Sequence, residues 1–204
     1  MTGPSALETG AARVAAATRR SQLAAASLFG ALGFGYGTWT SRLPAIKANL
    51  GLSTSQVSVV LLFAAIGAIF SFPVTAAALH RLGSRGASLL SGGLLALGLV
   101  GLGLAPGWIA ACVAMGVYGV VASTMDVAMN AQGVEVERAT GVPVMSRLHA
   151  VFSLGTMAGA LFASAITTAT TSVPLHFAVA ALGIAVAGAR GAATMQEPWW
   201  AWGF

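Results

Sequence analysis

The sequence predicts an all-α, polytopic membrane protein, and three observations lead to that fold class. Of its 204 residues, 57% are hydrophobic and only 7% are charged, whereas a soluble domain carries about 25% charged residues. The mean hydropathy is +0.84. The apolar residues also gather in six runs, each long enough to cross a bilayer as a helix, which takes about 20 residues. The alternating ten-residue pattern of a membrane barrel is not what these runs show.

Short polar, glycine- or proline-containing connections separate the six runs, and each run holds between 17 and 23 residues. A polar tail, residues 1–21, precedes them. The segment 190–204 follows, and its "PWWAW" is typical of a membrane interface or of a truncated or altered reading frame. The predicted spans are residues 22–40, 57–79, 87–105, 108–130, 148–169 and 173–189.

The first span is rich in glycine, with "GALGFGYG" at residues 30–37. Small residues let membrane helices approach closely, so we expect tight packing or a bend here. Near its end, the side chains of Tyr36, Trp39 and Thr40 either line a cavity mouth or form an aromatic belt. Arg42 and Lys47 follow in the connection, where we expect them to be solvated.

The second span is preceded by "LSTSQ" and the sixth by "TSVP", both of which are typical of helix starts. The connection between the second and third spans is "HRLGSRG", residues 80–86, and the dipeptide "PG" alone separates the third from the fourth.

The fourth span is apolar from Trp108 to Met125 and then reaches Asp126. An ionisable residue inside a span costs about 2.5–3.5 kcal/mol on insertion scales and by default marks a functional site. Gly119, Ser123, Asp126 and Asn130 follow at intervals of four, three and four residues and so share one helix face.

A face of small and polar residues is expected to look into the bundle. There Asp126 has the chemistry that a proton-coupling site of a transporter needs, with Ser123 and Asn130 beside it on a substrate cavity. Alternatively, Asp126 lies at a helix end, where it reaches water or pairs with Arg138 or Arg147.

The fifth span carries a second polar stripe, which includes His149 and Ser153. His149 is a candidate proton relay or hydrogen-bond donor to a polar solute; alternatively it is a satisfied histidine near the cytoplasmic end. The Ser153 hydroxyl is a second candidate for the cavity, or it bonds back to the carbonyl one turn earlier.

Lysine and arginine predict the orientation, because they concentrate in cytoplasmic segments. With the N-terminus inside, the inner segments hold eight of these residues and the outer loops hold two, Arg42 and Lys47. We therefore expect a multi-pass protein of the inner or plasma membrane with both termini in the cytoplasm.

Several function classes are disfavoured. Ten basic residues spread over the chain form no nucleic-acid patch. The single cysteine, Cys112, has no metal-ligand partner nearby and is expected to be a packing residue, so neither a metal nor a cofactor is predicted. An intramembrane serine protease needs a base held against its nucleophile from another element, whereas His149 and Ser153 lie on one helix. No enzyme is predicted.

Several stretches resemble the major facilitator superfamily (MFS). "LHRLGSRGASLLSG" is similar to its loop 2–3 motif, G-x-x-x-D-R-x-G-R-R. Arg81, Gly83 and Arg85 match the motif, while His80 stands at the Asp, Ser84 at an Arg and Ala76 at the first Gly. "GTWTSRLPAIKANLGLSTSQ", "DVAMNAQGVEVER" and "PVMSRLHAVFSLGTMAGA" resemble bacterial facilitators related to the fucose permease, the sugar:proton symporter branch, and more closely its uncharacterised inner-membrane members.

The resemblance covers residues 22–185 and implies the N-terminal six-helix half of a transporter whose two halves rock around a central site. It places the family's proton-coupling acidic residue on Asp126, its following asparagine on Asn130 and its polar residue of helix 5 on His149. Thr40 or a neighbour replaces an acidic residue of the fucose permease. His80 removes the Asp of the family's cytoplasmic latch, which weakens that latch or makes it sensitive to pH.

The predicted function is secondary, proton-coupled transport of a small polar solute such as a sugar, with the lipid bilayer, the solute and H⁺ as partners. Alternatively, the chain is a truncated, non-transporting half that needs a second half or a homodimer. Export of drugs or metabolites is a third interpretation.

Overall fold

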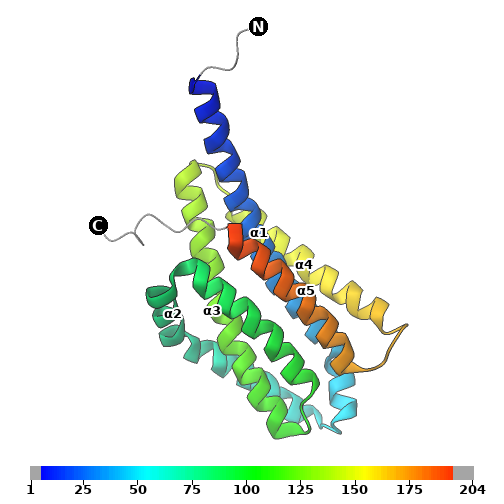
Figure 1. The fold of residues 1–204 in the computed structure, drawn as a ribbon. Coiled ribbons are helices and arrows are strands. Elements are labelled where there is room, and N and C mark those ends of the chain that lie inside the picture. The colour runs from blue at the N-terminus through cyan, green and yellow to red at the C-terminus, as the bar shows by residue number, and fades with distance from the viewer. Residues whose placement is uncertain (1–5, 195–204) are drawn as a thin grey trace.

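Residues 6–194, the part of the chain that the computed structural model describes, form five helices (Figure 1). They are α1 (Ala6–Asn49), α2 (Thr54–Gly103), α3 (Trp108–Thr140), α4 (Met145–Ile166) and α5 (Val173–Thr194). The predicted all-α class is therefore confirmed. Among the described residues, α2 to α5 are the four helices long and apolar enough to cross a membrane.

Helix α2 contains two of the predicted spans, which meet at Gly83. Its backbone there has φ 66° and ψ 174°, a conformation that only glycine adopts readily. The predicted connection "HRLGSRG" is thus helical except at this one residue. We call residues 54–82 the first segment of α2 and residues 84–103 its second segment.

Two helices are longer than predicted. Helix α1 begins at Ala6 within the predicted tail and continues through Pro44 to Asn49. Helix α3 continues ten residues beyond the predicted end of its span, to Thr140, because its more polar last turns keep good helix formers. The aromatic "PWWAW" of the predicted C-terminal tail lies outside the described residues.

Two helix starts follow the predicted sequence signals. The Ser53 hydroxyl accepts from the amide of Gln56 at 3.2 Å, and the Gln56 side chain accepts from the amide of Ser53 at 2.9 Å. This reciprocal capping box satisfies two backbone donors at the start of α2. At the start of α5, the Ser172 hydroxyl accepts from the amide of Leu175.

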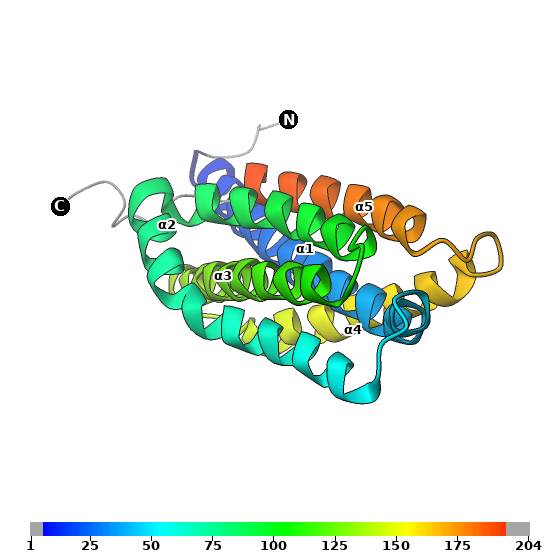
Figure 2. The ribbon, with the colours of Figure 1, turned by 90° about the horizontal axis from the view of Figure 1, so that it is seen from below.

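The helices run up and down along one bundle axis (Figure 2). The start of α1, the bend of α2, the α3–α4 connection and the end of α5 lie at one end, which we call the terminal end. The other three connections lie at the opposite end. The opposite end holds only two of the chain's ten basic residues, Arg42 and Lys47, so the helix directions preserve the predicted charge asymmetry.

Glycines bring α1 and α4 into backbone contact. A methyl group added at Gly33 or Gly37 of α1 would overlap a backbone carbonyl oxygen of α4, and one added at Gly155 or Gly159 of α4 would overlap one of α1. The pairs are four residues apart on both helices, as in the small-residue motif of membrane helix pairs. The glycine-rich first span therefore packs closely, as predicted.

The first segment of α2 packs against α3 in the same way. A methyl group at Gly67 would overlap the carbonyl oxygen of Gly116, and one at Gly119 would overlap that of Ala64. Two hydroxyl pairs add to the contact: Ser71 donates to Ser123 at 2.8 Å, and Thr75 donates to Thr124 at 3.0 Å. Such bonds between membrane helices contribute roughly 0.6–2 kcal/mol each.

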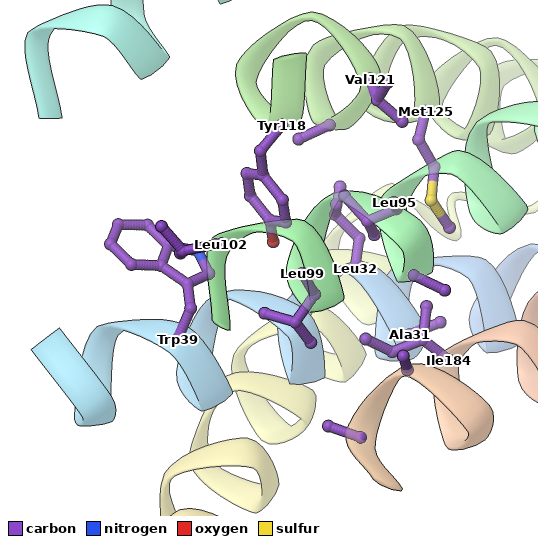
Figure 3. Packing of buried hydrophobic residues seen from close by; sticks show 14 of the residues in the cluster. Ala31, Leu32, Trp39, Leu95, Leu99, Leu102, Tyr118, Val121, Met125 and Ile184 are labelled. Carbon is purple, nitrogen blue, oxygen red and sulfur yellow. The ribbon is translucent and has the colours of Figure 1, made fainter. Parts of the chain in front are cut away.

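The apolar core lies where α1, α3, α5 and the second segment of α2 meet (Figure 3). Leu32, Leu95, Leu99, Tyr118 and Ile184 are at most 1% exposed and come from all four. Helix α4 adds little to this core, because it packs on the outer side of α1.

Candidate functional site

An open cavity of about 270 Å³ lies between α3 and α4. These two helices scarcely touch each other, whereas α1 packs against both of them. Helices α1, α2, α3 and α4 all contribute to its wall, which consists of Leu32, Tyr36, Ala68, Ala122, Ser123, Asp126 and Phe152. We call this the Asp126 cavity. Three of the predicted site residues, Tyr36, Ser123 and Asp126, line it.

Asp126 lies in the middle of a helix. Since α3 continues fourteen residues further to Thr140, or about 21 Å at 1.5 Å per residue, the alternative that placed Asp126 at a helix end was wrong. Its proposed ion pairs are not formed either. Arg138 is 4.0 Å from Glu135 instead, and among the described residues Asp126 has no salt-bridge partner.

Asn130 holds the Asp126 carboxylate from one turn further along α3. Its side-chain amide donates to the Asp126 backbone carbonyl at 2.8 Å and to the carboxylate Oδ1 at 3.2 Å. Asp126 is exposed and Asn130 half-buried in the chain on its own. The carboxylate therefore keeps lone pairs free toward the cavity.

One more predicted site residue, His149, lies near this carboxylate, as Tyr36 does. Tyr36 of α1 and His149 of α4 both interact electrostatically with Asp126. The His149 ring packs edge-on against Phe29, with ring centroids 5.3 Å apart, which fixes it at the α1–α4 contact. The structure thus gathers groups from three helices around one carboxylate.

The remaining predicted cavity residues lie off the cavity wall. The Ser153 hydroxyl donates to the backbone carbonyl of His149 at 3.1 Å, which is the second of the two interpretations given for it. The Thr40 hydroxyl likewise donates to the carbonyl of Tyr36 at 2.6 Å. Trp39 is only 7% exposed and so is part of the core, not of an exposed belt.

An aromatic cluster lies beside Tyr36, which lines the Asp126 cavity. The rings of Tyr36, Trp39 and Tyr118 lie with centroids 6.1–6.2 Å apart in all three pairs. The Tyr118 hydroxyl and the Trp39 indole nitrogen are both buried in this cluster. Sequence reasoning missed Tyr118, which lies one residue before the polar face of α3 and gave no periodic signal.

The loop 2–3 motif lies at the bend of α2. His80, Arg81 and Arg85 are exposed there, while Ser84 is buried and accepts a hydrogen bond from the side chain of Gln132 on α3. Gln132 was not predicted as a site residue. A neutral pair of buried polar groups thus joins α2 to α3 at the terminal end.

Within the part of the chain that the structure describes, no three His, Cys, Asp or Glu side chains are grouped as metal ligands would be. Cys112 is buried.

Three curated proteins are similar to this chain. An uncharacterized transporter of Sinorhizobium fredii, y4wD, is 35% identical over 148 residues, which are 72% of this chain and 39% of that protein. An uncharacterized MFS-type transporter of Yersinia pestis is 36% identical over 128 residues, 63% of this chain and 33% of that protein. Membrane protein MosC of Rhizobium meliloti is 30% identical over 122 residues, 59% and 30% of the two chains.

No protein-family model matches the chain. The chain spans less than two fifths of the length of each of these relatives. Its long apolar helices, together with its distant homology to MFS-type transporters, indicate that it is a multi-pass membrane protein. Two of these relatives are named as transporters.

Proposed function

We propose that this chain is the N-terminal six-helix half of an MFS secondary transporter, and that Asp126 couples proton movement to a small polar solute in the Asp126 cavity. The observation that carries the proposal is a carboxylate without a salt-bridge partner among residues 6–194, in the middle of a helix, on the wall of an open cavity. Such a group inside a membrane protein is by default functional.

The proposal counts six crossings by taking α1 as the first and the two segments of α2 as separate crossings. These two segments run in opposite directions on either side of Gly83 (Figure 2). With α1 as the first crossing, the chain returns to the terminal end after its sixth. The eight-to-two distribution of basic residues supports a cytoplasmic terminal end.

The cavity walls suit a hydroxylated solute. Tyr36 and Ser123 carry hydroxyl groups, Asp126 accepts hydrogen bonds, and Phe152 offers an aromatic face. The resemblance to the fucose permease branch makes sugars the first candidates. The polar residues Asn130 and His149 support the carboxylate, since the one bonds to it and the other lies within electrostatic range.

The cavity is open on one side, and the chain covers 30–39% of its relatives. A second half, or a second copy of this chain, would supply the opposite wall. This favours a second candidate function, namely that the chain binds solute but transports it only when paired.

Proteoliposomes that hold the chain and a trapped pH dye test the proposal. A panel of radiolabelled monosaccharides is added under an inward proton gradient, with uptake and internal acidification measured together. We expect one sugar to enter with protons, and we expect Asp126→Asn to abolish the coupled acidification. Glu135→Gln is the matched control, because Glu135 pairs with Arg138 away from the cavity, and it should transport normally.

Coupled proton movement that persists in the Asp126→Asn variant would contradict the coupling role. Sugar binding without uptake, seen as quenching of tryptophan fluorescence next to the cavity, would instead support the paired, non-transporting half.

A further inference from the structure

A second cavity, of about 510 Å³, lies between α1 and α4 toward the opposite end of the bundle. It shares no residue with the Asp126 cavity. We call it the Arg42 cavity, and its wall consists of Ser41, Arg42, Pro44, Ala45, Ala160, Ala163, Ser164 and Thr167.

Arg42 is buried, which corrects the expectation that it is solvated. Only 5% of the residue is exposed. Its Nη2 donates to the backbone carbonyl of Thr171, in the α4–α5 connection, at 2.6 Å, while its Nε is buried and bonds to none of the described residues. The guanidinium therefore has one neutral acceptor where it could make several bonds. Lys47 is half-buried, and its ammonium group bonds to the Thr54 hydroxyl.

The groups beside Arg42 are also unsatisfied. Thr38, one turn earlier on α1, is fully buried, and its hydroxyl has no hydrogen-bond partner within the described part of the chain. His176 of α5 is fully buried and interacts electrostatically with Arg42, and no described residue bonds to either of its ring nitrogens. Two buried polar side chains, one from α1 and one from α5, thus lie near one buried charge.

No described acidic residue neutralises this charge. Of the five acidic residues in the chain, Asp126, Glu135 and Glu137 lie in the half of α3 that runs to the terminal end, and Glu8 lies in the first turn of α1. The fifth, Glu197, is outside the described residues. A buried cation without a counter-charge is strongly disfavoured. We therefore expect an anion that is not one of the described residues to bind next to Arg42.

We propose that the Arg42 cavity binds a small oxyanion, a carboxylate or a phosphate, with Arg42 as its counter-charge. The planar guanidinium matches two oxygens of such a group, which favours an oxyanion over a halide. Ser164, exposed on the α4 wall, adds a hydroxyl donor. The occupant is either a free anion or the phosphate of a lipid headgroup.

Anion binding at this site stands apart from the proposed transport function, because its residues and its end of the bundle are different. Loss of anion binding in an Arg42 variant that still couples protons through Asp126 would separate the two. Loss of proton coupling in an Asp126 variant that still binds the anion would separate them equally.

Thermal unfolding of the purified chain in detergent tests the proposal with inorganic phosphate and acetate as probes. The ionic strength is held constant with sodium chloride. A ligand that binds only the folded state raises the unfolding temperature as its concentration passes its Kd. We expect a saturable rise with phosphate or acetate relative to chloride, and we expect Arg42→Gln to abolish it. Lys47→Gln, which removes the other cation at this end, should leave it unchanged.

Ser164→Leu provides a second variant that leaves the guanidinium in place. It fills the mouth of the cavity from an exposed position, so it should fold normally and still lose the anion response. A lipid arm compares nanodiscs of phosphatidylcholine with and without phosphatidylglycerol. Arg42-dependent stabilisation by the anionic lipid, with no further effect of free phosphate, identifies the headgroup as the occupant. The proposal fails if neither source stabilises the wild type, or if Arg42→Gln responds as the wild type does.

Discussion

Gly33 of α1 lies directly against the backbone carbonyl of Phe152 on α4, with no room for a side chain between them. We therefore expect Gly33→Ala to force the helices apart and to destabilise the fold by about 1–3 kcal/mol, as overpacking does in other cores. Cys112 supplies the measurement. It is the one cysteine of the chain and is buried, so its reaction with a maleimide dye on heating reports unfolding.

Gly93→Ala is the matched control for this substitution. Gly93 lies in a helix and a methyl group there would meet no atom within 4 Å. The same change should leave the unfolding temperature unchanged or raise it slightly. Equal effects of the two substitutions would rule out the close approach of α1 and α4.

The bend at Gly83 depends on a left-handed backbone, with φ at 66°. An alanine there would be strained by roughly 1–3 kcal/mol. We expect Gly83→Ala to lower the temperature at which Cys112 becomes reactive, while Gly101→Ala, which meets no neighbouring atom, should not. A Gly83→Ala variant as stable as the wild type would mean that this residue does not need the left-handed conformation.

Glu137 caps the start of α4 from the end of α3. Its Oε1 accepts from the amide nitrogens of Val144 and Met145 at 2.6 and 2.8 Å, and Val144 itself has no side-chain cap to offer. Because a carboxylate at a helix start also meets the positive end of the helix dipole, Glu137→Ala should cost about 1.5–3 kcal/mol. Faster proteolysis within residues 141–144 would locate the effect.

Glu135→Ala is the comparison for Glu137→Ala. Glu135 pairs with Arg138 at 4.0 Å on the helix surface, and such pairs contribute about 0–1 kcal/mol. If Glu135→Ala lowers the free energy of unfolding as much as Glu137→Ala does, then the loss of a negative charge, and not the loss of the cap, explains the effect.

Gln132 and Ser84 form a buried hydrogen bond between α3 and α2. Gln132→Leu leaves the Ser84 hydroxyl without its donor, and we expect a loss of about 1–3 kcal/mol. The double variant, with Ser84→Ala added, should recover part of that loss, because the Ser84 hydroxyl that lacked a donor is then absent. A double-mutant cycle on the Cys112 unfolding temperature measures this coupling, and additive effects of the two changes would argue against the bond.

The fold class followed from the sequence because bilayer length and apolarity alone determine where helices cross. Helix ends did not follow. The polar residues after Asn130 suggested a loop, yet α3 continues to Thr140, since polarity marks exposure and not the end of a helix. The "HRLGSRG" segment likewise contains one non-helical residue, and nothing local distinguishes Gly83 from the glycines that stay helical.

The candidate site could be predicted only where one helix carries it. Ser123, Asp126 and Asn130 follow helical spacing on α3, so their common face was visible in the sequence. Burial of Arg42 depends on Thr171 and on His176 of α5, which are far away along the chain. No local pattern on α1 indicates such partners, and a loop arginine is solvated by default.

Glycine contacts also divide the molecule mechanically. One stiff unit consists of α1 and α4 and another of the first α2 segment and α3, since backbones in direct contact leave no side chains to rearrange. Between α3 and α4 the chain has almost no such contact. A movement of one unit relative to the other would therefore change the gap between α3 and α4, and Asp126 lies on the α3 side of that gap.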